Sequence, residues 1–254
     1  MYLDGPRPVL DASLAGELRG FGVVNLEGPV GVGLPGEGLR LVHDPGALAS
    51  LTTAGIAFAS IANNHASDAG PGGPDATAQA LQDAGIAAFG GDRLAIRDGV
   101  NFAAYDLEQG VPADLAERLA VAPHPLVVAF HVTGDASPEP SPVLREAVDV
   151  AVAAHAEVIV AHGTHVFGPV ERRDGSVIAW GLGNLAFDCK CTNHADGLVL
   201  VVALGDSTSA RVVPIHAGLL GAPATLAFDL DAYLDTLGAL SRSPLTREGA
   251  GARF

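Results

Sequence analysis

Five apolar stretches of this sequence end in side chains that can bind a metal ion or transfer a proton. In the clearest of them, the run from Ile56 to Ala62 leads directly to Asn64 and His65 and then to Asp68. The other four stretches span residues 23–27, 127–131, 158–165 and 180–188. Because open α/β sheets place their chemistry beyond the carboxyl ends of their strands, we expect these five ends to meet. The sequence therefore predicts a polar site at one edge of a sheet.

Asn64 and His65 are the strongest pair of candidates. The amide oxygen of asparagine suits Mn, Fe or Mg, and a histidine beside it can protonate a leaving group. Asp68, three residues further on, either orients the His65 ring or begins the turn. The alternative is that Asn63 and Asn64 only stabilise the turn and that His65 only contacts a backbone carbonyl.

Glu27 and three histidines are the other candidate metal ligands. Glu27 follows a predicted strand, where its carboxylate could bridge two cations or, equally well, cap backbone amides. His131 ends one apolar run, and His162 and His165 follow another. One histidine at a strand end is more often structural, but three imidazoles after two apolar strands favour a metal site. The remaining histidines lack this context and are expected to be surface or partly buried residues: His43, His124, His155, His194 and His216.

The segment from 183 to 194 contains supporting candidates and both cysteines. A glycine turn precedes Asn184, and we expect Asn184 and Asp188 to hold the metal ligands in place without binding the metal ion themselves. Cys189 and Cys191 are separated by one residue and are expected to be reduced thiols, because cysteines this close rarely form a structural disulfide. With His194 they could bind zinc, but that set is one protein ligand short of four.

The chain of 254 residues is strongly acidic, with 29 Asp and Glu against 14 Lys and Arg and a formal charge of -15. Such a charge repels nucleic acid and anionic membranes, so binding to either is not expected. An anionic substrate would need local compensation, which a divalent metal ion supplies. No segment is long and apolar enough to span a bilayer, and the first residues lack the features of a secretion signal. We therefore expect a cytoplasmic protein without a membrane anchor.

Predicted strands and helices alternate first, and strands dominate the last third. The predicted strands are 21–25, 56–62, 86–89, one or two within 94–105, 126–130, 157–161, 177–179, 198–203 and 210–215. The main predicted helices are 45–54, 75–84, 142–154 and 230–240. This pattern is typical of an α/β fold with mixed sheets. We expect a single domain, residues 1–254, with its core at 21–204 and a frayed end at 241–254.

Five motifs, taken together, carry a family resemblance. They are, in order, VVNLEGPV at 23–30, SIANNHASDAG at 60–70, AFHVTGD at 129–135, EVIVAHGTHVFGPVE at 157–171 and VIAWGLGNLAFD at 177–188. On these motifs the chain resembles the CapA family of poly-γ-glutamate capsule proteins, which have a metallophosphoesterase (calcineurin-like) fold. The resemblance covers residues 21 to about 204.

The resemblance implies both a fold and a site. The fold would be a four-layer α/β/β/α sandwich of two mixed sheets, with one or two divalent metal ions (Mn, Fe, Zn or Mg) at the strand ends. Those ions would generate a hydroxide nucleophile near neutral pH. Glu27 would bridge the metals, and His65, with Asp68 beside it, would be the catalytic imidazole. The other ligands would be Asn64, His131, His162 and His165, and the supporting residues would include Asn25 and Asp188.

The chain differs from the family pattern in two places. Family members usually begin with a strand that carries Gly-Asp and further metal ligands, and no such strand precedes Asn25 here. We therefore expect the sandwich without that amino-terminal strand, its exposed edges covered by a homodimer or by residues 1–20. His162 and His165 are separated by two residues, whereas the common pattern separates the histidines by one.

Three functions follow from these observations. The first is a metal-dependent phosphoesterase for a small anionic substrate, with metal-bound hydroxide as nucleophile and His65 as general acid. The second is hydrolysis or assembly of a γ-glutamyl polymer. The third is a non-catalytic protein that binds a ligand or partner in the same pocket. Metal content distinguishes the first from the third, and activity on each substrate class distinguishes the first from the second.

Overall fold

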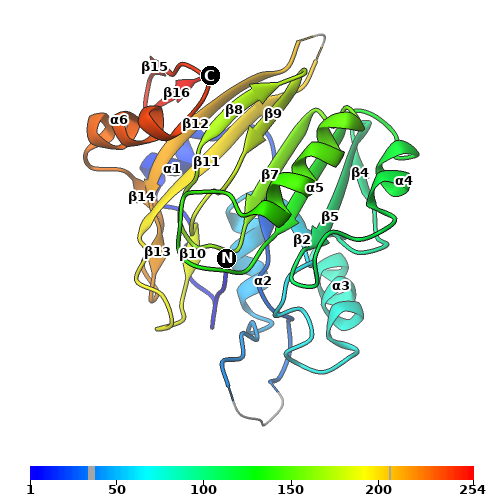
Figure 1. The fold of residues 1–254 in the computed structure, drawn as a ribbon. Helices are drawn as coiled ribbons and strands as arrows, with labels where there is room; N and C mark the ends of the chain where they lie inside the picture. The colour runs from blue at the N-terminus through cyan, green and yellow to red at the C-terminus, as the bar shows by residue number, and fades with distance from the viewer. Residues whose placement is uncertain (34–37, 206) are drawn as a thin grey trace.

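A computed structural model describes residues 1–33, 38–205 and 207–254 of the protein. The fold is α/β with mixed sheets, as the sequence predicts (Figure 1). The largest sheet has the strand order β4-β5-β6-β7-β9-β8. Its strands are β4 (Ala95–Arg97), β5 (Val100–Asp106), β6 (Leu126–His131), β7 (Val158–His162), β8 (Val170–Arg173) and β9 (Ser176–Ala179). Strands β5, β6, β7 and β9 are parallel, so their carboxyl ends lie along one edge.

The amino-terminal part of the chain forms a smaller parallel sheet of order β1-β2-β3. Its strands are β1 (Gly22–Asn25), β2 (Ile56–Ser60) and β3 (Ala87–Phe89), connected by helices α2 (Ala47–Thr53) and α3 (Gly73–Asp83). Helix α3 has proline in its first turn and is followed by Gly85, whose φ is +77°. These are the residues that favour a helix start and a helix end.

The two sheets pack face to face between layers of helices. Phe58 and Phe89 of the smaller sheet contact Phe102 and Ala129 of the larger one, and the rings of Phe58 and Phe102 stack at 4.5 Å. Helices α4 (Leu115–Ala120) and α5 (Pro142–Ala153) cover the outer face of the larger sheet. Helices α2 and α3 cover the outer face of the smaller one. The order of layers is therefore α/β/β/α, as expected.

Helix α5 shows how local sequence sets this packing. The Ser141 side chain accepts the backbone N–H of Leu144, and Pro142 is the first helical residue. The buried residues of the helix recur at the spacing of one helical face and are Leu144, Ala147, Val148, Ala151 and Val152. This face packs against β6 and β7, the strands that end in candidate histidines.

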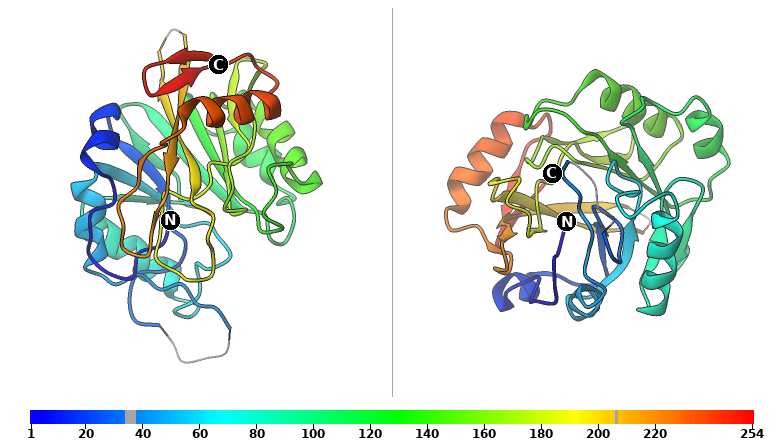
Figure 2. Two further views of the ribbon diagram at one scale, coloured as in Figure 1. Left: turned by 90° about the vertical axis from the view of Figure 1, so that its left-hand side faces the viewer. Right: turned by 90° about the horizontal axis from the view of Figure 1, so that it is seen from below.

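The last third of the chain forms a further sheet of order β11-β12-β16-β15, with β14 also paired to β12. Its strands are β11 (Asp196–Ala203), β12 (Ser209–His216), β14 (Thr225–Leu226), β15 (Thr246–Glu248) and β16 (Gly251–Arg253). Helix α6 (Leu230–Leu240) and the β15–β16 hairpin lie together at one end of the molecule (Figure 2, left). The expectation that 241–254 is frayed is wrong, because β16 pairs with β12 and Ala252 is fully buried.

Residues 1–20 reach from the edge of the smaller sheet to the carboxyl-terminal sheet and include helix α1 (Ala12–Glu17), which packs against β12 and β14. The backbone of Met1 accepts the N–H of Glu27 at 2.9 Å, and Tyr2 pairs with Phe187 of β10 (Ala186–Phe187). Strand β10 pairs in turn with β13 (Gly218–Leu219). Across the described part of the chain, every helix is too short or too polar to cross a membrane.

Candidate functional site

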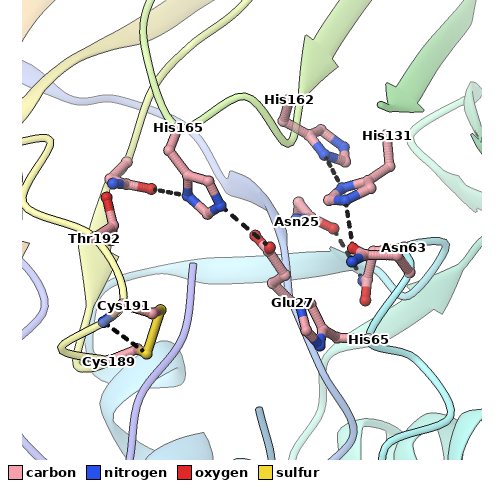
Figure 3. A network of polar contacts seen from close by, with 12 residues as sticks. Asn25, Glu27, Asn63, His65, His131, His162, His165, Cys189, Cys191 and Thr192 are labelled. Carbon is pink, nitrogen blue, oxygen red and sulfur yellow. Dashed lines mark hydrogen bonds and ion pairs between the residues drawn. A yellow bond between two sulfur atoms is a disulfide. The ribbon is translucent and has the colours of Figure 1, made fainter. Parts of the chain in front are cut away.

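Strand ends from both sheets meet at the candidate site (Figure 3). Strands β6 and β7 place His131 opposite His162, with their Nδ1 atoms 2.9 Å apart. Asn64, from the loop after β2, places Oδ1 2.8 Å from Nε2 of His131. Glu27, which follows β1, lies 3.6 Å from Nε2 of His165. The structure thus brings the five candidate metal ligands to one region.

The hydrogen bonds of His131 and His162 determine where their protons lie. With Oδ1 of Asn64 as acceptor, His131 carries its proton on Nε2, so its Nδ1 accepts the Nδ1–H of His162. Nε2 of His162 then holds a free lone pair, and this buried atom has no hydrogen-bond partner among the described residues. Burial lowers the pKa of His131 to about 3 and the pKa of His162 well below its usual value. Both rings are therefore neutral at pH 7, the form that binds metal ions.

His165 reaches the site through a turn that requires glycine. Gly163 has a φ of +113°, and a Cβ atom there would lie 2.3 Å from the carbonyl oxygen of Val132. Nδ1 of His165 lies 2.9 Å from Oδ1 of Asn184, which makes Nδ1 the donor and leaves the lone pair of Nε2 toward Glu27. A carboxylate oxygen and an imidazole lone pair 3.6 Å apart fit a cation between them. The wider spacing of His162 and His165 is thus compatible with both rings reaching the site.

His65 is held by Asp68. Nδ1 of His65 lies 2.8 Å from Oδ2 of Asp68, and the same oxygen accepts the backbone N–H of Leu41 at 2.7 Å. Of the two roles predicted for Asp68, this geometry supports orientation of the ring. The contact engages Nδ1 of His65 and not Nε2.

Three asparagines form hydrogen bonds around the candidate ligands. Asn184 holds His165, and Oδ1 of Asn25 accepts a hydrogen bond from Nδ2 of Asn63 at 3.2 Å. Asn63 is not among the predicted site residues and is predicted only as a residue that could stabilise the turn, although it directly precedes Asn64.

Asp188 is not among the residues that contact the imidazoles. It forms an ion pair with Arg7 at 2.8 Å and accepts the backbone N–H of Gly221 at 2.9 Å. Its place at the end of an apolar run resembles that of the other candidates, but its side chain fixes the amino-terminal segment instead.

The expectation for the two cysteines is wrong. Cys189 and Cys191 form a disulfide with each other and are not reduced thiols. A disulfide leaves no thiolate for the alternative zinc site with His194. The sequence separation of two residues does not prevent the bond, because the loop brings their Cα atoms to 5.2 Å.

The candidate metal donors form two groups. The described residues contain no cluster of three or more His, Cys, Asp or Glu side chains placed to hold one ion. One group is His162 with the amide oxygen of Asn64, and its third member, His131, would bind an ion only after losing the Nε2 proton that it donates to Asn64. The other group is Glu27 with His165. Glu27, His162 and His165 also line a cavity of about 900 Å³. The chemistry of both groups fits Mn, Fe, Zn or Mg, with water or substrate completing each coordination shell.

His43 is buried, with 1% of its surface exposed, contrary to the expectation of a surface or partly buried residue. It pairs with Val30, and its Nδ1 accepts the N–H of Leu3 at 3.2 Å. Burial lowers the pKa of His43 to about 3. The preceding Leu41 and Val42 are the sequence signal that this segment enters the core.

Acid should destabilise the metal-free protein because His43 and His131 are neutral when folded. The unfolded chain binds a proton on each ring below pH 6.5, whereas the folded protein does so only near pH 3, so the unfolded state gains protons first. Between pH 7 and pH 5 we expect the free energy of unfolding to fall by about 2 kcal/mol for each of these imidazoles. Urea unfolding at the two pH values measures this. His162 contributes in the same direction, because burial lowers its pKa as well, so the His43→Gln variant should lose about a third of the effect. An equal pH dependence in the variant would contradict the assignment.

The chain matches one family of known proteins, while no curated protein matches it. Residues 7–99 and 98–189 match the family described as bacterial capsule synthesis protein, PGA_cap. The matched segments contain β1, β2, β6, β7 and β10, the strands around the site. They cover well over half of the chain and confirm the resemblance to the CapA family. The chain therefore belongs to the family of bacterial capsule synthesis proteins.

Proposed function

We propose that this chain is a metal-dependent phosphoesterase that hydrolyses an anionic substrate with His65 as the general acid. The observation that carries the proposal is the free lone pair at Nε2 of His162, beside the neutral ring of His131. An unpaired buried polar atom costs about 1–3 kcal/mol, so buried polar groups in folded proteins are nearly always paired. The unpaired lone pair of His162 Nε2 lies among other atoms that can bind a metal ion, which favours a ligand bound at this position.

The two groups of donors are the residues that would hold divalent ions. Glu27 and His165 form one group, and the other consists of Asn64, His131 and His162. Bound ions would supply Lewis-acid charge that polarises the phosphoester and activates water. This charge would also offset the formal charge of -15, which otherwise repels an anion.

The chain itself supplies proton transfer and orientation. Asp68 accepts the Nδ1–H of His65 and fixes the plane of the ring, so that Nε2 is the atom that gives its proton to the leaving oxygen. Asn184 holds His165 in the tautomer that leaves Nε2 unprotonated. The low pKa of His131 prevents a positive charge there from repelling a cation.

Hydrolysis of bis(4-nitrophenyl) phosphate by the purified chain tests the proposal. We expect turnover with added Mn²⁺, loss of turnover with a chelator, and recovery when Mn²⁺ is returned. The His124→Ala variant is a suitable control, because His124 is partly exposed and contacts Glu157 at the amino-terminal end of β6. A preparation that binds less than one transition metal ion per chain and shows no turnover after Mn²⁺ addition would identify a non-catalytic binding protein.

The family favours a γ-glutamyl polymer as a second candidate substrate, because its members are described as capsule synthesis proteins. The same residues would then act on an amide bond, with His65 protonating the leaving nitrogen. Shortening of poly-γ-glutamate, measured by size-exclusion chromatography with Mn²⁺ present, would support this substrate. An unchanged polymer together with turnover of the phosphodiester would support the phosphoesterase.

A further inference from the structure

Asn63 contacts the backbone on both sides of Glu27. Its Nδ2 donates to the carbonyl oxygen of Leu26 at 2.9 Å, and its Oδ1 accepts the N–H of Gly28 at 3.2 Å. Nδ2 also donates to Oδ1 of Asn25 at 3.2 Å. With 4% of its surface exposed, Asn63 makes these bonds away from competing water.

The chain turns sharply at the point that Asn63 holds. The N–H of Leu26 donates to Ser60 of β2 at 2.9 Å, which keeps β1 and β2 together up to Leu26. Gly28 has a φ of +110°, and a Cβ atom there would lie 2.0 Å from the carbonyl oxygen of Leu41. Glu27 lies between these two points. The side-chain amide of Asn63 therefore links the loop after β2 to the backbone on both sides of Glu27, beyond the point where the pairing of β1 with β2 ends.

Asn63 and Asn64 hold the two groups of donors from adjacent positions in one loop. Asn63 binds the backbone around Glu27, and Asn64 contacts Nε2 of His131 across the sandwich. Since consecutive residues cannot move far relative to each other, the loop sets the separation of the two groups.

We propose that Asn63 is a positioning residue that fixes the carboxylate of Glu27 relative to His165 and to the other group of donors. This inference rests on the proposed function, in which Glu27 binds a metal ion. Residues that hold metal ligands in place usually contribute a factor of about 10–100 to metal affinity. Asn63 would do so without touching the ion.

Mn²⁺ binding by isothermal titration calorimetry tests the proposal. We expect Asn63→Ala to raise the dissociation constant of Mn²⁺ by a factor of about 10 or more. Asn63→Asp keeps the size of the side chain and an oxygen toward Gly28 but loses the donor to Leu26, and it should weaken binding as well. In a Glu27→Gln background, Asn63→Ala should have no further effect, because Asn63 acts through Glu27.

Asn101→Ala is the matched control. Asn101 is also 4% exposed and also bonds backbone carbonyls, those of Gly99 and Pro125, at the end of β5 remote from the site. It should bind Mn²⁺ within a factor of about 2 of the wild type, since it contacts no candidate ligand. Equal losses of affinity in Asn101→Ala and Asn63→Ala, or wild-type affinity in Asn63→Ala, would overturn the proposal.

Hydrogen exchange tests whether Asn63 holds the turn at Gly28 independently of whether the protein binds a metal ion. The amide of Gly28 should exchange faster in Asn63→Ala than in the wild type, and amides of β5 should not. If the wild type binds no Mn²⁺, the proposed function fails, and faster exchange at Gly28 still establishes that Asn63 holds this turn. Unchanged exchange at Gly28 rejects the role of Asn63 whatever the metal content.

Discussion

Replacement of His65 by alanine should lower the turnover of a phosphodiester by a factor of about 10² to 10⁴ while the protein keeps its metal ions. In the proposed mechanism the leaving oxygen departs with the proton of His65, and no other imidazole of the site has the same arrangement. Nδ1 of His65 is engaged by Asp68, whereas His131 and His162 are neutral at pH 7 because burial lowers their pKa values. Asp68→Asn should cause a smaller loss, since the ring remains but its orientation is no longer fixed by a carboxylate.

The His165→Ala variant is the comparison for His65→Ala, because it should affect metal binding and not only proton transfer. Its Nε2 faces Glu27, so the variant should lose metal as well as turnover. Metal content by inductively coupled plasma mass spectrometry, measured beside kcat and KM, distinguishes the two variants. Equal loss of metal from the His65 and His165 variants would contradict the roles assigned to both.

The sequence predicts those contacts of the candidate site that follow from the direction of the strands. Parallel strands β6 and β7 each end in histidine, and their pairing places His131 beside His162 without further information. The loop after β2 carries Asn64 to the same edge because the two sheets pack face to face. Apolar runs that end in polar groups are visible in the residues alone, which explains why the strand ends could be predicted. The four layers are expected from the family resemblance.

Other contacts depend on segments distant in the chain, and the sequence alone does not reveal them. Asp188 ends an apolar run as the candidates do, but its partner is Arg7, 181 residues away. His43 is buried by its pairing with Val30 and by Leu3. The hairpin at the carboxyl end is ordered by β12, since short strands become stable only when a neighbour buries them. In each case contacts with a distant segment determine where the residue or strand lies, and the local sequence pattern does not.

Arg7→Ala should lower the free energy of unfolding by about 3–5 kcal/mol, the usual cost of removing one partner of a buried ion pair. Nε and Nη2 of Arg7 contact the two carboxylate oxygens of Asp188 at 3.0 and 2.8 Å, and the side chains are 9% and 2% exposed. The guanidinium also donates to the carbonyl oxygens of Ala222 and Gly218, so it connects the amino-terminal segment to the chain around β13. Burial by itself would raise the pKa of Asp188, but Arg7 and backbone N–H groups hold that pKa below its ordinary value. Without Arg7 a buried carboxylate would remain unpaired.

Urea unfolding of Arg7→Ala beside Arg93→Ala measures this cost against a matched control. Arg93 pairs with Asp75 at the surface, where the side chains are 45% and 81% exposed, and its loss should cost less than about 1 kcal/mol. Asp188→Asn should be less damaging than Arg7→Ala, because the amide oxygen can still accept from Gly221. The double variant Arg7→Ala/Asp188→Asn should cost less than the sum of the single changes, since the second change removes the unpaired charge that the first leaves behind. Equal losses in Arg7→Ala and Arg93→Ala would show that the buried pair does not hold the amino-terminal segment in place.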